Sequence, residues 1–308
     1  MNAAEVPMIL FTVFTQMAVG AFIVLGVVQT VSTLRSQPAA VVDEVTEPAL
    51  YAIGPAMIAG LGVSMLHMHD ITNTFNVLRH FGGSWLSNEI VFGSAFAGLG
   101  FLFALVQWRK IGSPRLRQVL AALTAIVGIL FVASMSMVYY SLVTVPAWNT
   151  PATVIAFFTT ALVLGGLAMG AAFMTVLAWR RRRGTEASAG ARHITGLALK
   201  GIALLAVVAA GITLVRLPLY IKDLAMQGGA GLESAVAMEG PLLGVRIVLL
   251  VLGVALMAIF IFHFASRPAE RRNDTLLLAL TWVSLGLALA SELIGRGMFY
   301  HAMVRIGI

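Results

Sequence analysis

The chain has 308 residues, of which 59% are hydrophobic and 11% charged, and its mean hydropathy is +0.94. This composition excludes an ordinary soluble globular domain and predicts an all-α integral membrane protein, because only helices and closed barrels satisfy backbone polar groups in lipid. The net charge of +7 is not a nucleic-acid signal, since the basic residues gather in alternate loops. The chain has no cysteine, which excludes disulfides and iron–sulfur clusters held by its own thiolates.

Eight apolar segments are each long enough to cross a bilayer, which takes about 20 residues of helix for roughly 30 Å of hydrocarbon. They lie at about 7–31, 50–68, 87–108, 116–142, 151–179, 193–218, 240–264 and 274–301. The whole chain, 1–308, is therefore predicted to be one polytopic membrane domain. Eight helices allow two four-helix halves joined near 180–192.

The longest connections are predicted to be loops, at 32–49, 69–86 and 219–239, and the first of them is acidic and predicted to be solvated. Small residues at four-residue spacing let membrane helices pack closely. Two such pairs are present, Ser94/Gly98 and Gly166/Gly170.

Basic residues favour one set of alternate loops. Thirteen follow the first, third, fifth and seventh segments: Arg35, Arg109, Lys110, Arg115, Arg117, Arg180, Arg181, Arg182, Arg183, Arg192, Arg267, Arg271 and Arg272. Three lie on the other side, namely Arg79, Lys222 and Arg305. Cytoplasmic loops carry the excess of Lys and Arg, so this distribution predicts a protein of the bacterial cytoplasmic (inner) membrane with both termini in the periplasm.

The charges within or at the edge of the helices share one predicted face, the periplasmic one. They are His67, Glu89, Arg216, Arg246, Glu292 and Arg296. A charge at mid-bilayer costs roughly 2.5–3.5 kcal/mol on insertion scales and usually marks a functional site. The sequence therefore predicts a polar pocket on that side.

His67 ends the second segment and Glu89 begins the third, so the two are predicted to lie at similar depth. Ser87 is a predicted N-cap, and Glu89 is then favoured by the helix dipole in the first turn, which is an alternative to a functional role. Trp85 is typical of the interfacial aromatic belt as well as of a pocket.

Glu292 and Arg296 are four residues apart, in the order that favours an ion pair on one helix face. A structural ion pair and a direct role in binding a ligand are both open for them. Arg246 and Arg216 add positive potential to the predicted pocket, although either side chain is also suited to snorkel toward the interface.

Five stretches, in order from the first segment to the last, resemble the membrane-anchor subunits of the dimethyl sulfoxide reductase family of molybdenum oxidoreductases. They are EVPMILFTVF (5–14), SMLH (64–67), WLSNEI (85–90), TVPAW (144–148) and ELIGRGMFY (292–300). The resemblance covers essentially the whole chain. After the histidine, where the family usually has Leu-Gly, this chain has Met68-His69.

The resemblance implies a subunit that oxidises menaquinol and has neither haem nor an iron–sulfur cluster of its own. It implies a four-cluster ferredoxin-like iron–sulfur subunit as partner and, through it, a molybdopterin subunit that reduces dimethyl sulfoxide or a related S- or N-oxide. Anchors of tetrathionate, polysulfide or selenate reductases stay open as alternatives. The quinol-site residues of the family correspond to His67 and Glu89.

The chemistry of these residues fits quinol oxidation independently of the resemblance. Oxidation of a quinol releases two protons, and a histidine and a desolvated carboxylate are suited to accept them. Trp85, Arg246, Glu292 and Arg296 are the further candidates for the pocket. The electrons need a redox centre, and the chain lacks the cysteines to hold an iron–sulfur cluster, so a partner must provide one. Because the predicted pocket lies on the periplasmic side, we expect the partner's cluster to dock there.

Two other classes of protein remain as alternatives. A haem b protein would use His67 or His69 together with His301 as axial ligands. A secondary transporter favours broken helices and ion ligands at the midplane, whereas here Pro7, Pro55, Pro151, Pro218 and Pro241 are all predicted near helix ends.

Overall fold

The computed structural model describes residues 5–65, 79–261 and 274–307, and these residues form helices and connections without a strand. Seven of the described helices are long and apolar enough to cross a membrane. They are α1 (Val6–Leu34), α3 (Trp85–Trp108), α4 (Pro114–Tyr140), α5 (Pro151–Arg182), α6 (Ala189–Gln227), α8 (Pro241–Ala255) with its π-helical continuation η3 (Leu256–Ile261), and α10 (Asp274–His301). The prediction of an all-helical, multi-pass membrane protein is thereby confirmed.

The second predicted segment corresponds to α2 (Ala39–Met65), which begins at Ala39 rather than at residue 50. The predicted loop at 32–49 is therefore mostly helix, and its acidic residues are not simply solvated. Asp43 accepts a hydrogen bond from Lys110 Nζ at 2.8 Å, and Glu44 accepts one from Ser188 Oγ at 2.7 Å and pairs with Arg180 at 3.2 Å. This turn of α2 ties together the α3–α4 and α5–α6 connections.

The Lys110 ammonium also pairs with Glu47. Burial lowers the pKa of Lys110, but the hydrogen bonds and charges of Asp43 and Glu47 together raise the pKa by more than burial lowers it. The pKa of Lys110 therefore lies above its ordinary value. The lysine stays charged, and its two carboxylate partners neutralise part of the basic α3–α4 connection.

The predicted loop at 219–239 is also helical. α6 continues through Pro218 to Gln227, and after Gly228, whose φ is +67°, the short helix α7 (Gly229–Met238) follows. The predicted segment ended at Pro218, and a proline in a helix interior is unfavourable because it lacks an N–H and clashes with the preceding turn. Here the helix is held on both sides of the proline, since Leu217 and Leu224 are both buried. Two of the five prolines thus lie in helix interiors, Pro218 in α6 and Pro55 in α2, whereas the other three lie at the first or second position of a helix.

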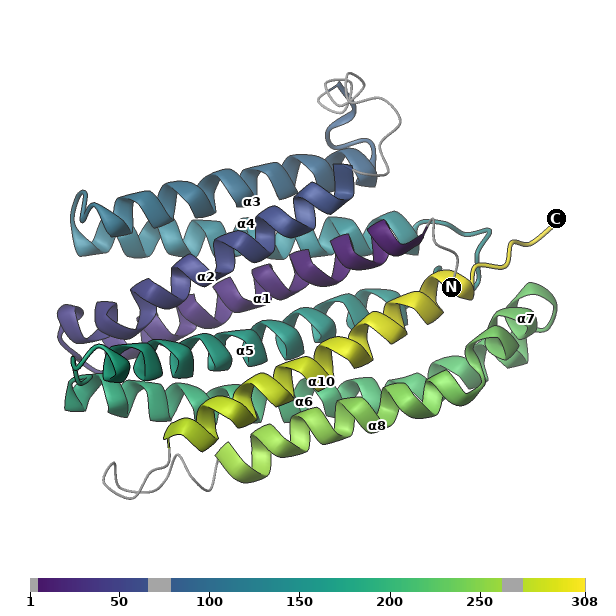
Figure 1. Cartoon of the computed structure of the whole chain (residues 1–308). Coiled ribbons are helices and arrows are strands. Elements are labelled where there is room, and N and C mark those ends of the chain that lie inside the picture. The colour runs from purple at the N-terminus through teal and green to yellow at the C-terminus, as the bar shows by residue number, and fades with distance from the viewer. Residues whose placement is uncertain (1–4, 66–78, 262–273, 308) are drawn as a thin grey trace.

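Figure 1 shows the helices in two groups, with α1 to α4 on one side and α5 to α10 on the other. The groups meet where α1 packs against α5. A Cβ added to Gly20 would lie 1.8 Å from the carbonyl oxygen of Ala161, and one on Gly165 would lie 2.2 Å from the Gly20 carbonyl carbon. We call this contact the α1–α5 seam. Its two backbones touch because neither glycine has a side chain.

The small-residue pairs predicted from sequence have unequal roles. A Cβ on Gly98 would meet no described residue within 4 Å, so Gly98 makes no close helix contact in the described part of the chain. Gly170 does face a neighbour, since an added Cβ would lie 3.2 Å from Met257 Cε.

The start of α1 and the end of α10 lie at the same end of the bundle, which we call the terminal end (Figure 1). The opposite end carries the α1–α2, α3–α4 and α5–α6 connections. Those connections and the adjoining helix ends hold ten of the thirteen basic residues described above, all except Arg267, Arg271 and Arg272, which lie outside the described residues. The predicted segregation of charge along the bundle is therefore present in the fold.

Candidate functional site

Most of the predicted pocket residues meet at the terminal end. Glu89, Arg246, Glu292 and Arg296 are all buried there, with exposed fractions of 4–8%. Trp85 begins α3 and is 42% exposed, as expected of a residue at the edge of the bilayer. His67 and His69 lie outside the described residues.

Glu89 lies deeper than the sequence predicted. α3 begins at Trp85 and its N-cap position is Ser84, so the predicted N-cap at Ser87 is wrong. Glu89 is consequently more than a turn inside the helix rather than in its first turn. Its side chain is 7% exposed, and no hydrogen bond joins its carboxylate to another described residue. A favourable interaction with the helix end is therefore a poor explanation for this buried carboxyl group.

Two tyrosines that the sequence did not single out face this carboxylate. The hydroxyls of Tyr139, from α4, and Tyr300, from α10, are hydrogen-bonded to each other at 2.7 Å. Glu89 is close enough to interact electrostatically with both tyrosines. We call Glu89, Tyr139 and Tyr300 the carboxyl–phenol cluster.

Arg296 lies next to the carboxyl–phenol cluster and interacts with both tyrosines electrostatically. Its guanidinium donates to Gln16 Oε1 of α1 at 3.0 Å and lies 3.8 Å from the centre of the Phe157 ring. The predicted ion pair with Glu292 is wrong, because Glu292 Oε2 instead accepts a hydrogen bond of 2.6 Å from Thr160 Oγ1 of α5. The arginine thus contacts α1 and α5, and the glutamate bonds to a different residue of α5.

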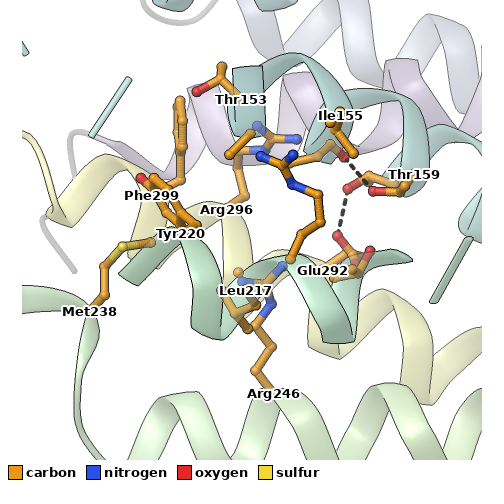
Figure 2. A pocket seen from close by; sticks show the side chains of 16 residues that line it. Thr153, Ile155, Thr159, Leu217, Tyr220, Met238, Arg246, Glu292, Arg296 and Phe299 are labelled. Atoms are coloured by element: carbon orange, nitrogen blue, oxygen red, sulfur yellow. Dashed lines mark hydrogen bonds between the residues drawn. The ribbon is translucent and has the colours of Figure 1, made fainter. Parts of the chain in front are cut away.

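A cavity of about 70 Å³ lies on the Glu292 side of Arg296, between α5, α6, α8 and α10. Figure 2 shows Glu292 and Arg296 from α10, Tyr220 from α6 and Arg246 from α8 around it. Arg216 of α6 is half-buried and also lines it. Arg296 thus lines this cavity and also lies within electrostatic range of the two phenols of the carboxyl–phenol cluster.

Similarity to known proteins extends over nearly the whole sequence. Residues 1–302 match the family described as "DMSO reductase anchor subunit (DmsC)". The chain belongs to this anchor-subunit family.

Individual members of the anchor-subunit family are similar to this chain over most of its length. The C subunit of the anaerobic dimethyl sulfoxide reductase of Escherichia coli (strain K12) is 31% identical over 313 residues, 99% of this chain and 96% of that protein. Its namesake in Haemophilus influenzae (strain ATCC 51907 / DSM 11121 / KW20 / Rd) is 31% identical over 208 residues, 67% of this chain and 68% of that protein. The anaerobic dimethyl sulfoxide reductase subunit YnfH of E. coli (strain K12) is 29% identical over 305 residues, 99% of this chain and 96% of that protein.

The described part of this anchor-subunit family member holds no group of three or more His, Cys, Asp or Glu side chains arranged for a metal ion. His301, the haem-ligand candidate within the described residues, is exposed at the end of α10. An axial ligand of haem b belongs in an apolar pocket inside the bundle, so the position of His301 does not favour the haem alternative.

Proposed function

We propose that this chain is the membrane anchor of a reductase for dimethyl sulfoxide or a related S- or N-oxide, and that it oxidises menaquinol at the terminal end. The electrons pass to a four-cluster ferredoxin-like iron–sulfur subunit and then to a molybdopterin catalytic subunit. The observation that carries the proposal is the buried Glu89 beside two hydrogen-bonded phenols, in a member of the anchor-subunit family.

The residues support a division of tasks in the reaction. Oxidation of a quinol to a quinone removes two electrons and two hydroxyl protons. A buried carboxylate has a strong tendency to take up a proton, because burial disfavours its charged form, so Glu89 is suited to accept one of them. His67, predicted at similar depth, accepts the other. The two electrons leave through the partner's nearest cluster, since the chain has no cysteine with which to hold one.

The remaining pocket residues orient the headgroup. Arg296 is held by Gln16 and Phe157, so its positive charge is fixed beside the phenols, where it stabilises negative charge on a quinol oxygen as a proton leaves. Trp85 borders the entrance from the lipid interface. Arg246 and Glu292 lie next to this site, around the cavity that Arg296 also lines. That cavity, of about 70 Å³, is far smaller than the roughly 300–1,000 Å³ of typical small-molecule pockets.

In the proposed topology eight helices, including the segment at 50–68, span the bacterial inner membrane with both termini in the periplasm. The iron–sulfur subunit docks over the terminal end, on that side. Because the quinol protons are then also released on the periplasmic side, the step does not pump protons.

Substitution of the two proton acceptors tests the proposal. We expect His67→Ala and Glu89→Gln to abolish quinol-driven reduction of the acceptor by the purified complex. Reduction driven by a viologen dye should persist, because that donor feeds the partner's clusters directly. Glu239→Gln is the matched control, since Glu239 is an exposed carboxylate at the same end.

Normal quinol oxidation by both variants would overturn the proposed site. Loss of both the quinol-driven and the viologen-driven activity would indicate failed assembly, which is measured separately as the amount of partner subunit bound to membranes. Reductase activity of the complex is measured with a panel of acceptors, namely dimethyl sulfoxide, tetrathionate, polysulfide and selenate, to determine which of them it reduces.

A further inference from the structure

The cavity between α5, α6, α8 and α10 has an excess of positive charge. Three arginines line it, Arg216, Arg246 and Arg296, together with one carboxylate, Glu292. Arg296 and Glu292 bond to uncharged side chains, and neither Arg216 nor Arg246 has an ion pair with a described residue. At this depth an uncompensated charge is costly, so the lining is suited to a ligand that brings negative charge.

Arg246 provides the most direct indication of a ligand. It is 8% exposed, and no described residue accepts a hydrogen bond from its guanidinium, of which the Nε atom is fully buried and unpartnered. Figure 2 shows this side chain rising from α8 toward the cavity. Buried donors are normally paired, so an unpaired guanidinium beside a cavity marks a position where an acceptor binds.

The position of Arg246 is fixed before any ligand arrives. Its guanidinium packs directly on Gly295 of α10, where an added Cβ would lie 2.4 Å from both Cζ and Nε. In addition, its own carbonyl oxygen accepts a hydrogen bond from Ser291 Oγ at 2.8 Å. A prepositioned donor loses less conformational entropy on binding.

The other polar groups of the lining do not compete for the role of donor. The hydroxyls of Thr153, Thr159 and Tyr220 each donate to a backbone carbonyl oxygen, and that of Thr160 donates to Glu292. The donors left for a ligand are therefore guanidinium N–H groups, whose planar fork matches the oxygens of a phosphate or carboxylate.

We propose that this cavity binds a phosphate-class oxyanion, held chiefly by Arg246 and Arg216. A volume of about 70 Å³ admits a small anion but not a quinol ring. Arg216, Thr213 and Ile155 are half-buried, so the cavity reaches the outer surface between α5 and α6. The oxyanion is therefore either the headgroup phosphate of an anionic phospholipid or free inorganic phosphate.

The experiment uses the complete complex, delipidated in an uncharged detergent and without quinol. Its Tm is measured against increasing inorganic phosphate, with chloride replaced to keep ionic strength constant, and separately against phosphatidylglycerol. We expect at least one of the two to raise the Tm by a few degrees. Loss of charge-assisted hydrogen bonds in Arg246→Gln should weaken that binding roughly 10- to 100-fold.

Three further variants sharpen the result. Arg305→Gln removes the same charge from an exposed position at the same end and should leave binding unchanged. Glu292→Gln removes the lining carboxylate and should tighten binding, the opposite of what a merely structural role predicts. Arg216→Gln, at the rim, provides the charge test if Arg246→Gln does not assemble.

A shift with inorganic phosphate supports a free oxyanion, and a shift with phosphatidylglycerol alone supports the headgroup. Stabilisation by neither, or equal stabilisation of wild type, Arg246→Gln and Arg216→Gln, would overturn the proposal. Because no quinol is present, these outcomes are independent of whether Glu89 and His67 oxidise it.

Discussion

At the scale of single residues, the helix boundary at Trp85 decides what Glu89 can do. A helix beginning near Ser87 would leave this carboxylate at the helix end, whereas the observed boundary places it more than a turn inside the helix, buried and within electrostatic range of two tyrosines. Burial of a carboxyl group without an ion pair is costly, and a protein retains such a group where its chemistry is used.

The phenol pair gives a prediction at this scale. Tyr300→Phe removes the 2.7 Å hydrogen bond to Tyr139 and one polar neighbour of Glu89. If the pair orients the quinol, loss of one hydrogen bond should lower quinol-driven turnover roughly three- to tenfold while viologen-driven turnover is kept. Steady-state assays with both donors measure the difference.

Tyr140→Phe is the control. Tyr140 directly follows Tyr139 in α4, and its hydroxyl has no hydrogen bond to a described residue. Equal activities for the two variants would mean that the phenol pair is only part of the packing.

The sequence predicted that Glu89, Arg246, Glu292 and Arg296 share one end, because antiparallel helices bring alternate ends together. It did not predict the partners of these residues. A tyrosine near a helix end is typical of the interfacial belt, so the sequence does not distinguish Tyr300 from a belt residue. The i, i+4 spacing of Glu292 and Arg296 predicted an ion pair, but Thr160 and Gln16 on neighbouring helices provide other partners.

At the scale of helices, the predicted segments were correct in order, and 274–301 matches α10, but several were too short, most of all at the start of α2 and at the end of α6. Apolar length measures the part of a helix inside the hydrocarbon, not the polar turns beyond it. α6 has 39 residues and is thus about 58 Å long at 1.5 Å per residue, against a core of roughly 30 Å. The acidic start of α2 was missed for the same reason, since its charges bind the neighbouring connections rather than water.

The α1–α5 seam gives a prediction for helix packing. Gly20→Ala would place a methyl group 1.8 Å from the Ala161 carbonyl oxygen, so the two helices must separate. We expect little of this variant to accumulate in membranes, and a lower Tm for what does. Immunoblots of membrane fractions and thermal unfolding in detergent measure both quantities.

Gly26→Ala is the matched control on the same helix, because a Cβ there would meet nothing within 4 Å. If Gly20→Ala accumulates and unfolds as Gly26→Ala does, the seam is not a close contact. The sequence alone could not identify this pair, since Gly20 and Gly165 are far apart in the chain and neither belongs to the small-residue pairs that were predicted.

At the scale of the whole molecule, the distribution of basic residues predicts the orientation in the membrane. Reporter fusions after Arg183 should report the cytoplasm, and fusions after Ile308 the periplasm. Alkaline phosphatase and green fluorescent protein make a suitable pair of reporters, since each is active on one side. The reverse pattern would place the partner's docking face on the cytoplasmic side.

The absence of cysteine predicts the redox properties of the isolated chain. Purified without its partners, it should contain no stoichiometric iron and show no Soret band, because electrons are proposed to leave through the partner's clusters. Iron analysis and a visible spectrum test this directly. A haem absorbance would revive the alternative that uses His67 or His69.

The α1–α5 seam also bears on electrical insulation. Gly20 and Gly165 lie about midway along their helices, where the backbones of the two helix groups touch. A file of water molecules needs a continuous passage lined with polar partners, and at this level the contact between the backbones leaves no room for one. A respiratory membrane stores energy as a proton gradient, which any leak would dissipate. We therefore expect the missing side chains at these two positions to hinder the passage of water and protons between the two helix groups.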